Sequence, residues 1–495
     1  MRDALVRHLD WWGLRRFDRD EAYFQWQRAA LSGTDLQILH RLVELKRASQ
    51  AEPAADVAFY DQAAAPRILP VLYSQRYDYY LAVGPRVAER IIPCSSGATS
   101  VLDFGCGVGI LTTFYAQQHP EISFVGLDRS AVSIAVAQAQ ADRLGLKNVR
   151  FAALDVEHEA INGLYDLLIS THALVQSEQE PGLPSQSWRT LERTQAPIAQ
   201  AAFEGRTGLG ARLDRLCAAL SPRGRALVFE KTRQLARRIP FQRALAARGL
   251  TPLEDPIPLR YLLVEEVAED GPLYVLGRTT RESLQGRLVV WNEAPEEVEG
   301  QDLYRCRGEA AATVWERLPM RVPAWEARWE DPEVGEVGAE GGRCLGLFEY
   351  LYVTVKRRGR GILVRPWHEN SGFESGFRRA VAASRGQPGR FAGLIDETWP
   401  AAAAPDDPLQ TPLYENHTLA AIQVWSALQN HTILKETTFD EPGGMQRHLE
   451  MGKAGGMTYL YWATTFDQRQ VVIVEPSRAS LLDQYYQELL NSRTA

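Results

Sequence analysis

A short apolar segment that runs into three alternating glycines constrains the fold of this chain more than any other feature. Residues 101–111 read Val-Leu-Asp-Phe-Gly-Cys-Gly-Val-Gly-Ile-Leu, which predicts a strand over 100–104 and a helix over 110–118. Glycine is needed where the backbone turns tightly and where a ligand lies against bare main chain. The N–H groups at the start of the following helix can bind polar or anionic ligand groups. The pattern therefore predicts a ligand-binding turn between a strand and a helix.

Strand and helix patterns alternate on both sides of this turn. Strands are expected over 100–104, 123–127, 149–153, 165–170 and 225–230, and helices over 110–118, 131–144 and 209–220. Such alternation predicts a parallel sheet covered by helices on both faces. Two later apolar runs, 259–266 and 273–279, are joined by a short turn. We expect them to close the sheet as an antiparallel pair.

Three aspartates stand at the ends of the first three predicted strands. Asp103 lies at the strand end, two residues before the first glycine, where a carboxylate would repel a pyrophosphate and attract an ammonium group. Asp128, after the second strand, can accept hydrogen bonds from both hydroxyls of a ribose. Asp155, after the third, can accept an adenine amino group while Leu154 and Val156 flank the ring. Because the carboxyl ends of parallel strands share one edge, these residues predict a nucleoside site there.

This constellation resembles the class I S-adenosylmethionine-dependent methyltransferases over residues 57–280. Nicotinamide- and flavin-binding domains use a related glycine turn, but they account for neither the first aspartate nor the closing hairpin. The resemblance implies a seven-stranded Rossmann-like sheet, S-adenosyl-L-methionine as cofactor and transfer of its methyl group. Matching positions imply that the cofactor is held by Asp103, Gly105, Gly107, Gly109, Asp128, Asp155, Val156 and, from an aromatic segment over the site, Tyr73.

The fourth predicted strand is followed by Thr171-His172-Ala173-Leu174. A hydroxyl or ammonium acceptor requires a base, and His172 is the candidate; the alternative is that its ring only bonds to the backbone. The Asn/Asp-Pro-Pro-aromatic signature of enzymes that methylate planar amino groups in nucleic acids is absent here. Glu230 and Lys231 end the fifth strand at the same edge, where we expect them to be solvated.

Composition limits location, metal binding and partners. The five cysteines are scattered, and neither a C-x-x-C nor an H-E-x-x-H pattern occurs, so we expect no metal site and a reducing cytoplasm. No apolar run reaches 18 residues, which argues against a membrane span. The net charge is −7, and residues 281–495 carry 23 Lys and Arg against 30 Asp and Glu. Extensive phosphate contact is therefore unexpected, and nucleic acid is a poor candidate substrate.

The chain outside the methyltransferase-like region predicts further domains. Residues 1–56 are rich in helix formers and aromatics, which predicts a helical cap that either packs on the next domain or covers a pocket. A shift of 110 residues places Val314-Trp315 on Val424-Trp425, and after a one-residue gap Tyr350-Leu351-Tyr352 meets Tyr459-Leu460-Tyr461. We therefore expect a C-terminal α+β domain built by internal duplication, with copies over 281–385 and 413–495 and a linker over 386–412.

Three functions remain open at this stage. The first is a methyltransferase acting on a small molecule or a peptide or protein segment, with the duplicated module helping to recognise the acceptor. The second is a non-catalytic methyltransferase-like scaffold or binding protein. The third, which the acidic charge disfavours, is an RNA methyltransferase. The acceptor atom and the oligomeric state do not follow from the sequence.

Overall fold

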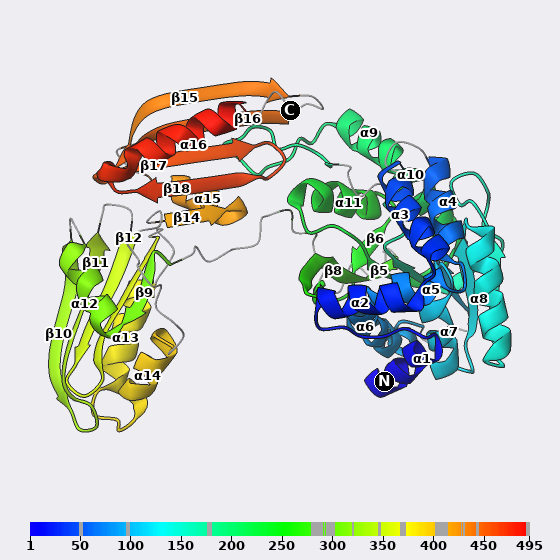
Figure 1. Cartoon of the computed structure of the whole chain (residues 1–495), viewed down its shortest axis with the longest axis horizontal. Coiled ribbons are helices and arrows are strands. Elements are labelled where there is room, and N and C mark those ends of the chain that lie inside the picture. The colour runs from blue at the N-terminus through cyan, green and yellow to red at the C-terminus, as the bar shows by residue number, and fades with distance from the viewer. Residues whose placement is uncertain are drawn as a thin grey trace. The chain divides into compact units, whose positions relative to one another are not determined.

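The computed structural model divides into two compact units. It describes residues 1–48, 53–95, 100–175, 181–278, 291, 293, 302–318, 321–344, 348–366, 373–400, 414–426, 428, 431–441 and 445–491. The first unit comprises Met1–Leu183 and Arg193–Glu293, and the second comprises Pro184–Glu192 and Ala294–Ala495. Figure 1 labels the elements of each unit.

The first unit is built on one mixed sheet. Its strands are β1 (Ser100–Phe104), β2 (Ser123–Asp128), β3 (Val149–Ala153), β4 (Tyr165–Thr171), β5 (Leu220–Phe229), β6 (Leu250–Pro252), β7 (Ile257–Leu263) and β8 (Glu266–Arg278). The order is β3-β2-β1-β4-β5-β8-β6, and β7 also pairs with β8. The first five strands are parallel, and β8 is antiparallel to β5.

The sheet has eight strands in the described part of the chain, where seven were expected. The 13-residue β8 accounts for the difference, because its two halves have different partners. Leu276–Arg278 pair with β6, and Glu266–Leu273 pair with β7. An antiparallel hairpin is present as β7 and β8, but its turn lies at Val264 and Glu265 and not between the two apolar runs. The residues expected to form the turn, 267–272, belong to β8 and pair with β7, whereas Leu273–Gly277 pair with β5.

Helices cover both faces of this sheet. The helices of the first unit are α1 (Arg2–Trp11), α2 (Asp20–Ala30), α3 (Gly33–Ala48), α4 (Pro53–Ala63), α5 (Ile68–Ser74), α6 (Tyr77–Ser95), α7 (Ile110–Gln118), α8 (Ala131–Arg143), α9 (Pro197–Thr207), α10 (Leu209–Ala219) and α11 (Leu235–Ala247). Of these, α2, α3 and α4 form a separate apolar cluster with residues of α5 and with Val264. Alternate residues of β4 face opposite ways: Leu167 packs in one apolar core with α1, α6 and α7, and Leu168 packs in another with α10 and α11. Burial on both faces explains why the strands read as continuous apolar runs.

The N-terminal helix α1 is part of the core of the first unit. Leu5 and Leu9 are fully buried in the cluster that covers one face of the sheet. His8, also buried, reaches α7 with both ring nitrogens: Nδ1 lies 2.7 Å from Oε1 of Gln117, and Nε2 lies 2.8 Å from the carbonyl oxygen of Ile110. Helix α1 therefore packs on the methyltransferase-like region, which is one of the two alternatives predicted for residues 1–56.

The second unit contains two antiparallel sheets. The first sheet has β9 (Tyr304–Arg307), β10 (Val322–Asp331), β11 (Gly335–Cys344), β12 (Phe348–Val355) and β13 (Gly359–Pro366), in the order β10-β11-β12-β13-β9. The second has β14 (Tyr414–His417), β15 (Thr432–Glu441), β16 (Met445–Ala454), β17 (Met457–Thr464) and β18 (Arg469–Val474), in the order β15-β16-β17-β18-β14. The order is thus the same in both.

The helices of the second unit are α12 (Gly308–Arg317), α13 (Phe373–Ser384), α14 (Arg390–Thr398), α15 (Thr418–Ser426) and α16 (Ala479–Asn491), with a 3₁₀ turn at Pro476–Arg478. Helix α14 falls within the stretch expected to be a linker. Its Phe391 and Ile395, together with Trp399, are buried in the apolar core of the first sheet. The Pro, Ala and Gly content of the surrounding residues obscured this i, i+4 apolar pair.

None of the described helices is long and apolar enough to cross a membrane.

Replacing His8 by alanine should destabilise the first unit. The substitution leaves the buried Ile110 carbonyl and Gln117 side chain without these contacts, which costs about 1–3 kcal/mol. We expect the thermal unfolding temperature to fall by several degrees in calorimetry. His40→Ala, at an exposed position of α3, is the control and should leave it unchanged. An unaltered unfolding temperature for His8→Ala would show that α1 does not stabilise this core.

Candidate active site

A cavity of about 640 Å³ opens where the parallel strands of the first unit end. Seven of the eight residues expected to hold the cofactor line it, as does His172; the seven are Tyr73, Asp103, Gly105, Gly107, Asp128, Asp155 and Val156. Gly109 is absent from the lining and instead precedes α7 as its N-cap. The tertiary structure therefore gathers residues from β1, β2, α5 and the segments after β1, β3 and β4 around one space.

The three glycines differ in what a side chain would meet. All have positive φ, at 72° for Gly105, 53° for Gly107 and 81° for Gly109. A Cβ on Gly105 would lie 2.2 Å from Cβ of Ala173, and one on Gly109 would lie 2.9 Å from Cβ of Ala137. A Cβ on Gly107 would meet nothing within 4 Å. Close packing thus requires the outer two, while the middle one presents bare main chain to the cavity.

Asp103 is a buried carboxylate without a cationic partner among the described residues. Its side chain accepts a hydrogen bond of 2.5 Å from the Thr112 hydroxyl. Burial raises its pKa to about 7, and the nearby Asp128 carboxylate adds to this effect. A carboxylate in this state gains most from a bound cation, which would restore its ionised form.

Asp128 connects the glycine turn to the end of β2. One carboxylate oxygen accepts a hydrogen bond from the Gly107 N–H and the other accepts one from the Ser130 N–H, each at 2.9 Å. Burial raises the pKa of this carboxyl group, and the two N–H donors oppose the increase. Each oxygen retains a lone pair for a ligand hydroxyl.

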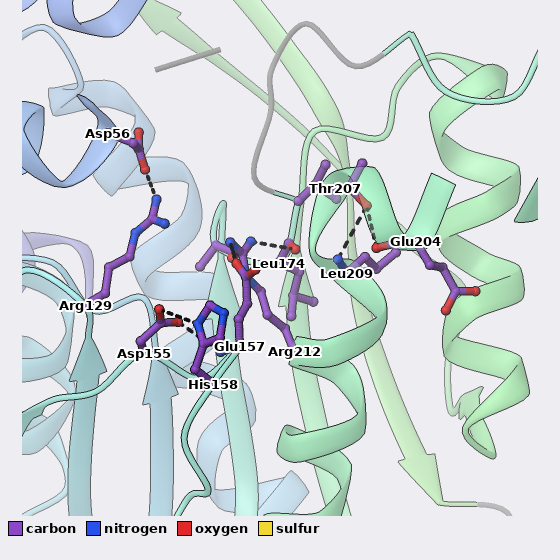
Figure 2. A network of polar contacts seen from close by, with 12 residues as sticks. Asp56, Arg129, Asp155, Glu157, His158, Leu174, Glu204, Thr207, Leu209 and Arg212 are labelled. Atoms are coloured by element: carbon purple, nitrogen blue, oxygen red, sulfur yellow. Dashed lines mark hydrogen bonds and ion pairs between the residues drawn. The ribbon is translucent and has the colours of Figure 1, made fainter. Parts of the chain in front are cut away.

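Asp155 lies at the open side of the cavity, half-exposed. It accepts a hydrogen bond from the Glu157 N–H at 3.0 Å, and its other oxygen lies 2.9 Å from Nδ1 of His158, as Figure 2 shows. Burial opposes ionisation, but these two partners lower the pKa of the carboxyl group overall. Val156 beside it is buried in the apolar core on one face of the sheet.

Two arginine–carboxylate pairs in the cavity wall could not be inferred from sequence spacing. Arg129 pairs with Asp56 of α4. Arg212 of α10 donates to Glu157 at 2.5 Å and to the Leu174 carbonyl at 3.0 Å (Figure 2). Arg129 and Asp56 are 73 residues apart in the chain, and Arg212 and Glu157 are 55 residues apart, so no local sequence pattern predicts either pair.

His172 has a charged group beside each ring nitrogen but a hydrogen bond to only one of them. It has a left-handed backbone with φ of 55°, and its N–H donates to the Phe229 carbonyl at 2.8 Å. Nδ1 lies 2.9 Å from a guanidinium nitrogen of Arg76, and Nε2 lies 3.2 Å from Asp270, outside hydrogen-bonding geometry. Because a guanidinium only donates, Nδ1 must be the acceptor and the proton of the neutral ring is on Nε2. Burial lowers the pKa of the ring, consistent with this neutral form.

The expectation that Glu230 is solvated was wrong. Its side chain is buried and accepts hydrogen bonds from the Leu174, Val175 and Lys231 N–H groups at 2.8, 3.2 and 3.0 Å. These donors compensate the carboxylate for lost water, so the residue fixes the segment after β4 against the end of β5. Its interaction with a segment 55 residues away could not be anticipated from the sequence.

A possible metal-binding group lies in the second unit, where none was expected. Glu436, His448 and Glu450 place one ligand atom each within 4.8 Å of one another. Nδ1 of His448 lies 2.6 Å from the Thr438 hydroxyl, and one Glu450 oxygen accepts from Tyr459 at 2.7 Å. These donors already occupy the group, so the geometry provides no argument for a metal ion.

Alanine at the first two glycines should have different effects on stability. Gly105→Ala combines positive φ with a clash against Ala173 and should cost about 3 kcal/mol or more. Gly107→Ala has only the backbone strain and should cost about 1–2 kcal/mol. Gly145→Ala, also at positive φ in open space but outside the cavity, is the control and should match Gly107→Ala. Thermal unfolding of the three variants measures the difference; equal losses for Gly105 and Gly107 would contradict the packing described.

Comparison with known proteins agrees with this geometry. Residues 95–229 match a family model described as a methyltransferase domain. The malonyl-[acyl-carrier protein] O-methyltransferase of Acetivibrio thermocellus is 33% identical over 101 residues, or 20% of this chain and 35% of the relative. The trans-aconitate 2-methyltransferase of Deinococcus radiodurans is 38% identical over 91 residues, 18% of this chain and 33% of the relative.

A third relative acts on a different class of acceptor. The ribosomal RNA small subunit methyltransferase C of Vibrio parahaemolyticus is 34% identical over 115 residues, 23% of this chain and 31% of the relative. The chain thus spans about a third of the length of each of these three relatives. The matched family, the strand order and the glycine turn together show that this chain contains a methyltransferase domain of class I, whose cofactor is S-adenosyl-L-methionine.

Proposed function

We propose that this protein transfers a methyl group from S-adenosyl-L-methionine to a small-molecule or peptide acceptor. The observation that carries the proposal is the open position at Gly107, beside which Asp103, Asp128 and Asp155 line one cavity. Bare main chain flanked by carboxylates suits a ligand with an ammonium group and a ribose, and the residues present therefore fit the cofactor.

Each cofactor-binding residue has a separate proposed role. Asp103 would hold the ammonium group, because its buried carboxylate has no cationic partner among the described residues. Asp128 would accept the ribose hydroxyls with the lone pairs left by Gly107 and Ser130. Asp155 would accept the adenine amino group beside Val156, and Tyr73 would cover the site from α5.

When bound, the cofactor supplies an activated methyl group, so the chain mainly has to position the acceptor and exclude water. His172 is our candidate for acting on the acceptor. Its Nδ1 faces Arg76, so it could take a proton only if that arginine moved away. The contacts observed therefore favour an orienting role for His172 over that of a general base.

The C-terminal unit supports a proposed duplication. In the first sheet, the stacked rings of Trp315 and Tyr352 have centres 4.0 Å apart, and the Tyr350 hydroxyl donates a hydrogen bond of 2.5 Å to the Glu340 carboxylate. In the second sheet, the stacked rings of Trp425 and Tyr461 have centres 4.9 Å apart, and the Tyr459 hydroxyl donates a hydrogen bond of 2.7 Å to the Glu450 carboxylate. Equivalent partners on equivalent strands, together with the common strand order, are what copies of one ancestral unit would retain.

We propose that this duplicated unit helps to recognise the acceptor. The segment Pro184–Glu192 follows β4 in the chain but belongs to the second unit, where Trp188 stacks on His448 with ring centres 3.4 Å apart. The polypeptide that leaves the catalytic edge of the sheet is thereby anchored in the other unit. We also propose a cytoplasmic location, which the free thiols of Cys106, Cys217, Cys306 and Cys344 support.

An RNA acceptor is the second candidate, because one relative acts on ribosomal RNA. The net charge of −7 disfavours it. A non-catalytic scaffold is the third. RNA binding that weakens steeply with salt would favour the second, and failure to bind cofactor would favour the third.

Calorimetry with S-adenosylhomocysteine tests the proposal. The wild-type protein should bind one equivalent, and Asp128→Ala should weaken binding at least tenfold by removing acceptors for the ribose and support for the Gly107 turn. Gly107→Ala should weaken S-adenosylhomocysteine binding similarly, because the new methyl group would fill the open space beside the main chain where the cofactor is proposed to lie. Gly145→Ala should bind as the wild type does. Absence of binding to the wild-type protein would refute the proposed activity.

Cofactor affinity should also depend on pH through Asp103. In the free protein this group has a pKa of about 7, so below pH 7 a proton must leave before the carboxylate can pair with an ammonium group. Affinity for S-adenosylhomocysteine should therefore rise by up to about tenfold per unit between pH 5.5 and 7 and then level off. Asp103→Asn should bind more weakly with a flat profile. A wild-type affinity that does not change with pH would contradict this role.

A further inference from the structure

We propose that Arg76 binds a carboxylate of the methyl acceptor, so that the acceptor is an organic acid. The inference rests on the proposed function and names the substrate class of the same cavity.

Arg76 lies between α5 and α6 and lines the cavity. One guanidinium nitrogen lies 2.9 Å from Nδ1 of His172, and the guanidinium carbon lies 4.3 Å from the centre of the Tyr79 ring. A guanidinium carries five N–H donors, and the described side chains accept from it only at His172. Most of its hydrogen-bonding capacity is therefore available to a ligand.

Arg76 also differs from its neighbours in having no carboxylate partner. Arg129 and Arg212, which line the same cavity, pair with Asp56 and Glu157. Within the described ranges, no Asp or Glu oxygen lies within 4.0 Å of the Arg76 guanidinium. A cation withdrawn from water is costly unless an anion accompanies it. The missing anion is a natural contribution of the ligand, and a carboxylate matches the guanidinium fork.

Asp270 does not supply that anion. Its carboxylate lies 3.2 Å from Nε2 of His172 and accepts a hydrogen bond from the Tyr261 hydroxyl. The neutral imidazole thus separates Arg76 from the acid on its far side. The hydrogen bond to Nδ1 of His172 holds the guanidinium in the cavity wall.

The contacts of Arg76 with residues at the ends of the strands favour the acceptor over the cofactor as the source of the carboxylate. The aspartates proposed to hold the cofactor lie at the ends of β1 and β2 and after β3. Arg76 contacts His172 after β4, and that ring packs on Phe229 of β5 with centres 4.8 Å apart. In the order β3-β2-β1-β4-β5, the ends of β4 and β5 lie beyond β1 from the nucleoside side.

Titrations of the full-length protein already loaded with S-adenosylhomocysteine test the inference. The probes are malonate, succinate and trans-aconitate, each compared with its neutral amide. We expect at least one acid to bind and its amide not to bind. Arg76→Gln should weaken binding of that acid about 10- to 100-fold, and Arg76→Lys, which keeps the charge but loses the fork, should weaken it less. Arg260→Gln, at an exposed position on β7, is the matched control.

Two further measurements distinguish a failure of this inference from a failure of the proposed function. Arg76→Gln should bind S-adenosylhomocysteine within about threefold of the wild type, and it should not unfold at a lower temperature, because it removes an unpaired charge. A tenfold or greater loss of S-adenosylhomocysteine affinity would assign the arginine to the carboxylate of the cofactor and overturn the inference. Binding of S-adenosylhomocysteine without binding of any acid would overturn it as well. No S-adenosylhomocysteine binding to the wild type would refute the proposed function and, with it, this inference.

Discussion

The carboxylate of Asp128 is the interaction on which the candidate site depends. It ties the Gly107 N–H to the end of β2 and caps the start of α8 through Ser130. This contact fixes a turn in which three residues have left-handed φ, a conformation that only glycine adopts without strain. Once the turn is fixed, the strand order determines which other side chains can reach the cavity.

The cavity contains charges that the described residues do not neutralise. Asp103 is a carboxylate without a cation, and Arg76 is a cation without a carboxylate. Arg129 and Arg212 in the same wall are fully paired, so the contrast does not arise from a general lack of partners. A ligand pair that brings an ammonium group and a carboxylate would neutralise both.

Much of the fold and of the cofactor side of this site could be predicted because the relevant information is local. Asp103 and the glycines lie within seven residues of one another, and Asp128 and Asp155 each end a recognisable strand. The acceptor side could not be predicted in this way. Arg76 meets His172 across 96 residues, and Glu230 accepts hydrogen bonds from a segment 55 residues distant. The apolar face of α14 was hidden among residues typical of a linker.

By itself, the sequence determined the βα alternation, the glycine turn and the three acidic positions, because strand periodicity and positive φ are properties of neighbouring residues. The tertiary structure alone decided which charges are paired in the cavity wall and which are left for a ligand. It also decided that the protonated nitrogen of His172 faces Asp270. These outcomes depend on side chains brought together from distant segments, and the cost of burying a charge follows from that assembled environment.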